Sequence, residues 1–168
     1  KNINGVISDY SFKLIDKDQI IGAMIYGRIA MANVWKKYVN SENELIELRR
    51  LCCIDDTPKN TESYFIGYTL RWLKKNSNIK KVISYADETY NHSGTIYKAS
   101  NFKHIGMTNK GKVIVYNNKL YHDKTIRTKY KGKLKPYCLK IKDALNTGEA
   151  YYKNTLGKHI YIYQLKKD

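Results

Sequence analysis

Residues 47–63 read Glu-Leu-Arg-Arg-Leu-Cys-Cys-Ile-Asp-Asp-Thr-Pro-Lys-Asn-Thr-Glu-Ser, and this stretch is the strongest indication of the fold. Its first half, residues 48–54, is rich in apolar side chains and is typical of a buried strand. Thr57-Pro58 ends the strand, and Asn60 or Thr61 can cap the helix that follows. The free N–H groups at the start of such a helix favour an anion, although an ordinary strand-to-helix connection has the same pattern.

A second strand follows the helix. Apolar side chains recur at helical spacing over residues 63–76, and a short apolar run at residues 81–86 ends at Asp87. Strand, helix and strand in this order predict an α/β (α+β) fold, a mixed central sheet with helices packed on it. Because open sheets of this kind bind ligands where their strands end, we expect Asp55, Asp56 and Asp87 near one edge of the sheet.

The remaining segments complete one domain with a basic extension. The predicted elements are a strand hairpin over residues 10–31, a short helix over 94–100, a second hairpin over 112–126, a helix near 136–145 and a final strand over 159–165. We therefore expect a main domain over residues 1–128. Residues 129–168 are expected to form a basic C-terminal extension that packs on this domain or follows it.

Positive charge is concentrated in the second half of the chain. The formal net charge is +16, of which residues 1–97 carry +3 (14 Lys and Arg against 11 Asp and Glu) and residues 98–168 carry +13 (17 against 4). Many tyrosines lie among these lysines. Lysines interleaved with aromatic rings suit a phosphate backbone with unstacked bases, so we expect nucleic-acid contact, with a lysine-rich solvated surface as the alternative.

The composition also bears on the compartment. At 168 residues the chain fits one domain, and it has no apolar run long enough to span a membrane. No secretory signal is visible, although the chain begins at Lys1 rather than Met. The neighbouring Cys52 and Cys53 are expected in the core of a strand, an arrangement that is not a disulfide framework and that fits a reducing cytoplasm.

The order of the elements resembles the core of the GNAT acyltransferases. Tyr97 lies in a segment, residues 91–106, that is similar to the GNAT helix with a frequent tyrosine general acid. More closely, residues 47–51, 55–63 and 84–87, taken in order, look like the Mom-like phage DNA-modification proteins. This resemblance runs from about residue 45 to residue 127, roughly half of the chain.

The resemblance implies a function and a partner. It implies a GNAT-like catalytic domain that places a carbamoylmethyl (acetamido-type) group on the exocyclic amine of adenine in phage DNA. That modification shields the DNA from host restriction nucleases. Double-stranded DNA would be the partner and the cytoplasm of the bacterial host the location, with the oligomeric state left open.

Acylating or alkylating an adenine amine sets requirements that particular residues could meet. The amine is a poor nucleophile, so a carboxylate must accept its proton, and Asp55, Asp56 and Asp87 are the candidates. Arg50, or the N–H groups at residues 60–63, could polarise the donor carbonyl. The proton for the leaving group could come from the hydroxyls of Tyr97 and Ser63. The structural alternatives are a surface pair of Arg50 with Glu47, a core ring at Tyr97 and a turn cap at Asp87.

Reaching an adenine inside a duplex requires the base to be flipped out. Tyr85 is a candidate to stack on the extruded base. The backbone would be held by the lysines at the start of the extension: Lys129, Lys131, Lys133 and Lys135.

The donor stays open. The GNAT resemblance places cofactor binding at Lys59, Asn60, Thr61, Glu62, Ser63 and Asn91. Yet the loop over residues 57–62 has no glycine, its Pro58 has no N–H, and the Glu62 carboxylate would repel a phosphate. Acetyl-coenzyme A is therefore disfavoured as the donor, and another small activated molecule or an aminoacyl group is the alternative.

Metal chemistry is not indicated, because the four histidines show no ligand spacing. Two other functions remain open at this point. One is a GNAT-type N-acetyltransferase that acts on a protein, a tRNA or a small amine. The other is a nucleic-acid-binding protein without catalysis, against which the clustered carboxylates count.

Overall fold

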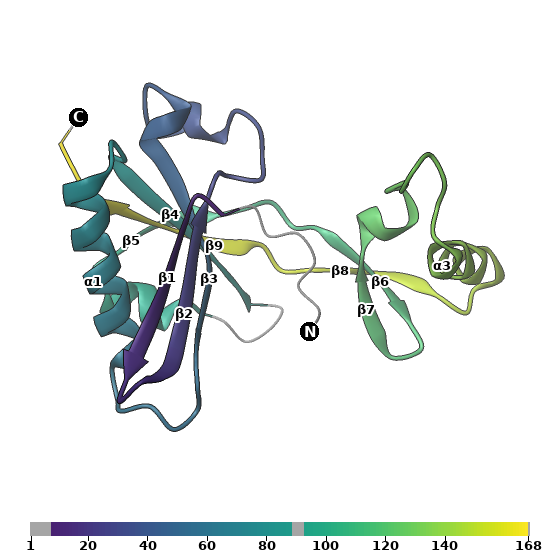
Figure 1. Cartoon of the computed structure of the whole chain (residues 1–168). Coiled ribbons are helices and arrows are strands. Elements are labelled where there is room, and N and C mark those ends of the chain that lie inside the picture. The colour runs from purple at the N-terminus through teal and green to yellow at the C-terminus, as the bar shows by residue number, and fades with distance from the viewer. Residues whose placement is uncertain (1–7, 89–92, 168) are drawn as a thin grey trace.

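The computed structural model describes residues 8–88 and 93–167, which form two β-sheets with helices packed on them (Figure 1). The larger sheet has the strand order β1-β2-β3-β4-β9-β5, and the smaller has the order β7-β6-β8. In chain order the elements are β1 (Tyr10–Asp16), β2 (Gln19–Gly27), η1 (Val34–Lys37), η2 (Glu42–Glu44), β3 (Leu45–Cys53), α1 (Thr61–Asn76), β4 (Lys81–Asp87), α2 (Thr95–Ala99), β5 (Lys103–Met107), β6 (Lys112–Tyr116), β7 (Lys119–His122), η4 (Asp123–Ile126), α3 (Pro136–Thr147), β8 (Tyr151–Asn154) and β9 (Lys158–Gln164).

The predicted strand–helix–strand unit is formed by β3, α1 and β4. The two strands are parallel, and α1 lies along one face of the larger sheet (Figure 1). The helix buries Phe65, Ile66, Leu70 and Leu73, each at most 3% exposed, against that face. These side chains share one side of the helix because they recur at its period, and each contributes about 1.5–3 kcal/mol by burial. The mixed α/β architecture expected from the sequence is confirmed.

The last strand lies inside the larger sheet. β9 pairs with β4 over its whole length and with β5 on its other side, whereas β6 and β7 belong to the smaller sheet with β8. The boundary expected at residue 128 therefore does not separate the two sheets. Residues 108–157 form an insertion between β5 and β9, which we call the small lobe, and the other described residues form the main lobe. The apolar pattern does not predict β8, because all four of its residues are exposed.

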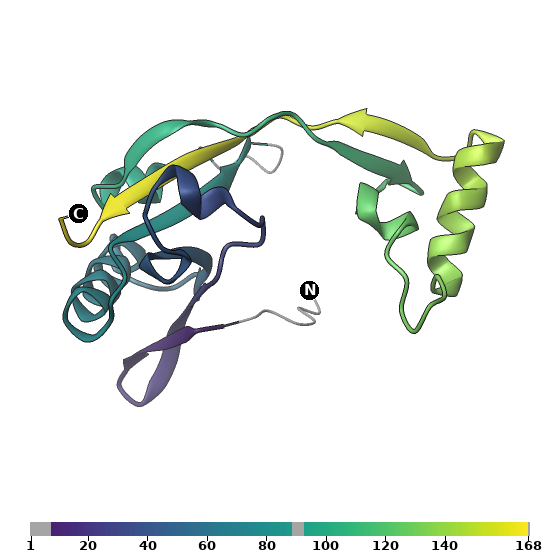
Figure 2. The same ribbon diagram turned by 90° about the horizontal axis from the view of Figure 1, so that it is seen from above.

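The small lobe has a core of its own. Ile114 of β6 packs with Ile141 and Ala144 of α3 and with Ala150. The lobe carries 12 Lys and Arg against 3 Asp and Glu, a balance of +9. Figure 2 shows it standing apart from the larger sheet, connected by two segments that run side by side.

The two connecting segments are hydrogen-bonded to each other. The Thr108 N–H donates to the Lys158 carbonyl oxygen at 2.9 Å, and the Lys158 N–H donates to the Thr108 hydroxyl at 2.9 Å. Further toward the lobe, the Thr155 N–H donates to the Gly111 carbonyl oxygen at 2.9 Å. The lobe is therefore held by a two-stranded ribbon rather than by a single flexible linker.

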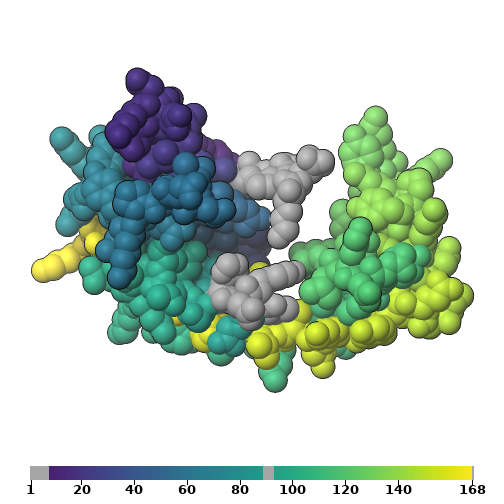
Figure 3. Space-filling view, turned by 90° about the horizontal axis from the view of Figure 1, so that it is seen from below, coloured from purple at the N-terminus to yellow at the C-terminus, as the bar shows by residue number. Residues whose placement is uncertain are grey.

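The face of the larger sheet opposite α1 looks toward the small lobe. A cluster of Val39, Leu45 and Ile83 covers part of this face, with Trp35 and Tyr38 packed against it. The space-filling view shows a wide opening between the two lobes (Figure 3). Among the described residues, we find no helix with the length and apolar character of a membrane span.

Candidate active site

The parallel strands separate in the middle of the sheet. In the described part of the chain, the ladder between β3 and β4 ends at the pair Glu47↔Ile83. Beyond this point β3 continues beside β2, and β4 continues beside β9. The buried Ser84 hydroxyl donates to the Leu48 carbonyl oxygen at 3.2 Å, and so bridges the strands where they part. We call the point where β3 and β4 separate the apex. Glu47 of β3 and Ser84 of β4 lie beside it.

Glu47 is the carboxylate at this apex. Burial raises its pKa, while the charges of Arg49, Lys158 and Arg50 and the N–H of Ala30 lower it. The net effect is an increase, so Glu47 holds its proton to a higher pH than an exposed glutamate does. A partly desolvated carboxylate with nearby cations is suited to accept a proton from a substrate.

A β-bulge brings Arg50 to the same face as Glu47. The pairing of β2 with β3 shifts between Tyr26↔Leu48 and Ile25↔Arg50, which leaves one extra residue in β3. Leu51 packs on the core beneath α1, so Arg50 points to the opposite face, where it is exposed. Its guanidinium donates to the Arg49 carbonyl oxygen at 3.0 Å.

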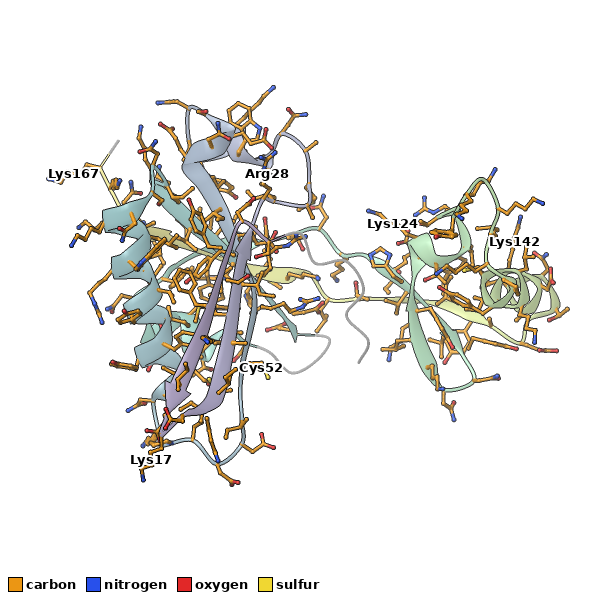
Figure 4. The ribbon with its side chains drawn as sticks, viewed as in Figure 1. Lys17, Arg28, Cys52, Lys124, Lys142 and Lys167 are labelled. Atoms are coloured by element: carbon orange, nitrogen blue, oxygen red, sulfur yellow. The ribbon has the colours of Figure 1, made fainter. Side chains whose placement is uncertain are left out.

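The same bulge explains why one expectation from the sequence was wrong. Cys52 was expected in the core, but it is exposed, because it lies two residues after Arg50 on the open face. Figure 4 shows Cys52 on the side of the larger sheet that faces the small lobe. Cys53 packs against the main core as expected, and burial raises its pKa.

Asp87 and Tyr85 join Glu47 on this face from β4. Asp87 pairs with Lys158 of β9, with 3.3 Å between the Asp87 Oδ2 and Lys158 Nζ atoms. Tyr85 lies two residues earlier, and burial, with a smaller effect from the Glu47 charge, raises the pKa of its hydroxyl to about 12. The face opposite α1 therefore carries a base, two cations, a carboxylate and a phenol.

Tyr97 approaches the apex from the other side. Its ring packs on Phe102 and Tyr161, with centroid distances of 5.6 and 5.4 Å. Burial raises the pKa of its hydroxyl, a hydrogen bond with Ser84 lowers it, and the charge of Glu47 raises it further. Tyr97 is thus a core ring whose hydroxyl reaches the apex, so the structural and the functional interpretations both describe it.

The residues of the turn before α1 lie apart from this cluster. Asp55 and Asp56 are exposed, and neither forms an ion pair with another described residue. Asn60 is the N-cap of α1 through its backbone, with φ 70°, and not through its side chain. The expected side-chain cap is absent: Asn60 has left-handed rather than the extended backbone angles of a side-chain cap, and the hydroxyls of Thr61 and Ser63 donate back to carbonyl oxygens of the turn, at 2.7 and 3.0 Å.

A shallow cavity of about 290 Å³ lies in this turn, between the end of β3 and the start of α1. Asp55 and Glu62 line it with carboxylates, and Lys59 is the one cation among the described residues of its lining, beside Asn60 and Thr61. One ammonium against two carboxylates does not fit a diphosphate, which carries negative charge itself. Asn91, which was also expected to bind the cofactor, lies outside the described residues.

The lysines expected to bind DNA lie in the small lobe. Tyr130 and Lys133 form a tight hairpin, with backbone bonds of 2.8 and 3.1 Å, and Lys131-Gly132 at its tip take positive φ. Tyr130 is 63% exposed, and the ammonium groups of Lys131 and Lys135 lie 5.8 and 5.3 Å from its ring centre. Lys129 is exposed beside them.

A hydrogen-bonded chain of two histidines lies on the face that α1 covers. His159 Nε2 lies 2.6 Å from Glu88 Oε1, and His159 Nδ1 lies 3.0 Å from His104 Nε2. Because β9 is paired with β4 and with β5 only in the folded chain, sequence spacing gives no sign of these two contacts. Among the described residues, no group of three or more acidic, histidine or cysteine side chains has the geometry of a metal site.

Comparison with known proteins matches nearly the whole chain to one family. The model of the Mom protein family matches residues 4–168. Methylcarbamoylase mom of Escherichia phage Mu is 29% identical over 116 residues, which are 67% of this chain and 48% of that protein. The chain therefore spans about half the length of this relative.

Solved structures share the fold. An N-acetyltransferase from Staphylococcus aureus Mu50 has a TM-score of 0.51 at 15% identity, over 93% of this chain and 67% of that one. Ribosomal-protein-S5-alanine acetyltransferase from Vibrio fischeri has a TM-score of 0.52 at 12% identity, over 93% of this chain and 61% of that one. The GNAT-like decarboxylase GphF, in complex with isobutyryl-CoA, has a TM-score of 0.50 at 12% identity, over 94% of this chain and 79% of that one. At these identities the likeness confirms the expected GNAT-like fold and nothing further.

Proposed function

The chain belongs to the Mom protein family, and on this basis we propose that it transfers a small acetamido- or carbamoyl-type group to the exocyclic amine of adenine in DNA. The observation that carries the proposal is the cluster of Glu47, Tyr85, Asp87 and Lys158 on the face that looks toward the basic small lobe. In a bacterial host cytoplasm, this modification would protect the DNA from restriction.

In the proposed step the amine nitrogen attacks the donor carbon that bears the leaving group, which is the carbonyl carbon for a carbamoyl-type group and the methylene carbon for an acetamido-type group. A nitrogen–carbon bond forms, and the bond from that carbon to the leaving group breaks with its electron pair on the leaving group. Glu47 accepts the amine proton, and the Tyr97 hydroxyl, kept protonated by its raised pKa, supplies a proton to the leaving group. Arg50 stabilises the negative charge that develops on the carbonyl oxygen, and Lys158 orients Asp87 beside the base.

The DNA would enter the opening between the lobes. The hairpin lysines of the small lobe, Lys131 and Lys133, would contact phosphates, and the target adenine would leave the stack to reach the main lobe. Tyr85 lies on the receiving face and offers its ring to the extruded base. The positive balance of the lobe favours a polyanion over a protein or a small amine as the acceptor.

The donor is proposed to be a small activated molecule that is not held by a diphosphate. The related folds include an isobutyryl-CoA complex, but the cavity between Asp55 and Glu62 has the wrong charge for coenzyme A. The donor carbonyl would instead lie at the apex, where the Arg50 guanidinium has N–H groups besides the one that donates to the Arg49 carbonyl oxygen.

Mass spectrometry of nucleosides from DNA of cells that express the chain tests the reaction. A new adenine nucleoside is expected with the intact chain and not with Glu47→Gln. Carbamoylmethyl and methylcarbamoyl groups are isomers, joined through methylene and carbonyl carbon respectively, so fragmentation is needed to tell them apart. Acyl transfer predicts the carbonyl linkage. If adenine stays unmodified when the intact, folded chain is supplied with extract of the cells that express it, the proposal is contradicted.

The salt dependence of DNA binding tests the role of the small lobe. For Lys131→Gln with Lys133→Gln, the slope of log affinity against log salt should become shallower by roughly 0.9 for each phosphate that the variant no longer neutralises. The matched control is Lys74→Gln with Lys75→Gln on α1, on the opposite side of the main lobe, which should leave the slope unchanged. Equal slopes for the two double variants would exclude the hairpin from the interface.

A further inference from the structure

The small lobe contains a cavity that the proposed reaction does not use. Its volume is about 430 Å³, and it lies between η4, α3 and β8. Ile126 and Leu145 give it an apolar wall, Lys142 and Asn146 project from α3, and Tyr151 and Tyr152 come from β8. Tyr151 and Tyr152 are 59% and 50% exposed, so neither side chain is buried in the core of the lobe.

These side chains suit a flat, polar-edged ring attached to a phosphate. Lys142 and Asn146 are one helical turn apart and therefore point to the same side of α3. The Asn146 amide both donates and accepts hydrogen bonds, as the edge of a nucleobase requires. A tyrosine ring offers a stacking surface that every base can use, and the Lys142 ammonium can reach a neighbouring phosphate.

The charge around the cavity indicates which polymer supplies the ring. The lobe has a balance of +9, and Figure 4 shows Lys124 and Lys142 both projecting from it. An apolar side chain of a protein would fit the Ile126 and Leu145 wall, but it would leave Asn146 without a partner and would gain nothing from the surrounding lysines. A nucleic acid satisfies the apolar wall, the amide and the ammonium together.

We propose that this cavity binds one unstacked nucleobase of the bound DNA, distinct from the adenine that reaches the main lobe. The inference rests on the proposed function for the identity of the polymer. The small lobe would then do more than hold phosphates: it would fix the position of the strand by capturing a second base. That capture makes the lobe a determinant of which adenines are modified.

The test places 2-aminopurine, an adenine analogue that fluoresces when unstacked, at successive positions of a duplex bound to the full chain. Fluorescence should rise at two positions, the target and one other. Tyr152→Ala with Asn146→Ala should abolish the second rise and lower affinity about 5-fold or more, with the salt slope unchanged. Tyr137→Ala removes a ring of similar exposure on α3 outside the cavity and should preserve both rises.

A second cavity variant and a parallel measurement of adenine modification separate the possible outcomes. Asn146→Asp leaves the rings in place and adds a negative charge to the cavity, so it should also abolish the second rise in a folded lobe. A single rise with the intact chain, or a second rise that persists in both cavity variants, overturns the inference. If the second rise is present but no adenine is ever modified, the proposed reaction fails and the cavity assignment stands.

Discussion

A methyl group at Gly157 would test whether the position of the small lobe matters for the reaction. Gly157 is buried in the ribbon that joins the lobes, and a Cβ there would lie 2.3 Å from the Thr108 carbonyl oxygen. Real Cβ atoms essentially never come closer than 3.0 Å. In Gly157→Ala the two segments must therefore move apart by roughly 0.7 Å, the difference between these distances.

The cost follows from the contacts on either side. Thr108 and Lys158 share two hydrogen bonds of 2.9 Å, one between their backbones and one from the Lys158 N–H to the Thr108 hydroxyl, and each contributes about 1 kcal/mol net. Removing both costs about 2 kcal/mol. A misplacement of about 1 Å in positioned groups can lower a rate by about 100-fold. We expect DNA affinity to change little, because the lysines and the core of the small lobe stay intact.

Denaturant unfolding, DNA binding and adenine modification should be measured on the same preparations. Gly67→Ala is the matched control: its Cβ would meet only the flexible end of Arg71 at 3.4 Å, and alanine stabilises the interior of α1 by about 0.5–1 kcal/mol. If Gly157→Ala keeps the full rate of modification at normal stability, the ribbon does not set the catalytic geometry and the reasoning is refuted.

Three further outcomes are expected. Glu47→Gln should lower the modification rate by about 10²–10⁴-fold and abolish the loss of activity at low pH. It should also stabilise the fold at neutral pH. The reason is that the raised pKa of Glu47 makes the stability of the intact chain fall as the pH rises above the ordinary pKa range of glutamate. A lower melting temperature at neutral pH would contradict this sign. Lys158→Gln should move the acid limb of the pH–rate profile to higher pH, because Lys158 lowers the pKa of Glu47; an unmoved limb would remove Lys158 from the site. Tyr26→Phe should cost about 1 kcal/mol in urea unfolding, as it removes the buried 2.7 Å bond to Thr69, and leave modification unchanged.

Local patterns predicted the core of the fold. The apolar run of β3, the helical spacing from Phe65 to Leu73 and the short run of β4 each encode one element within a few residues. Such periodicity decides which side of an element is buried, and the order of the three elements implies their parallel arrangement. Asp87 could be proposed for the site because it is the last residue of β4, and Arg50 because it lies within β3 near its end.

Glu47 was considered only as the partner that could pair with Arg50 and hold it, although the sequence carried a signal for a larger role. It is a carboxylate inside the apolar run of Leu45, Ile46 and Leu48, and such a residue is rarely left there without a partner. Its effect on the pKa of Tyr85 and of Tyr97 depends on the end of the ladder between β3 and β4. That end is not marked by any residue type in the sequence.

The sequence by itself determined the strand–helix–strand unit, the separate concentration of positive charge and the resemblance to a family, because each depends on residues that are neighbours along the chain. Only the tertiary structure decided that β9 returns between β4 and β5, which brings Lys158 to Asp87. It also decided that the bulge before Arg50 places this residue on the same face of the sheet as Glu47. Pairing between distant strands sets both features, and the free energy of such pairing is shared among many contacts rather than written in a local motif.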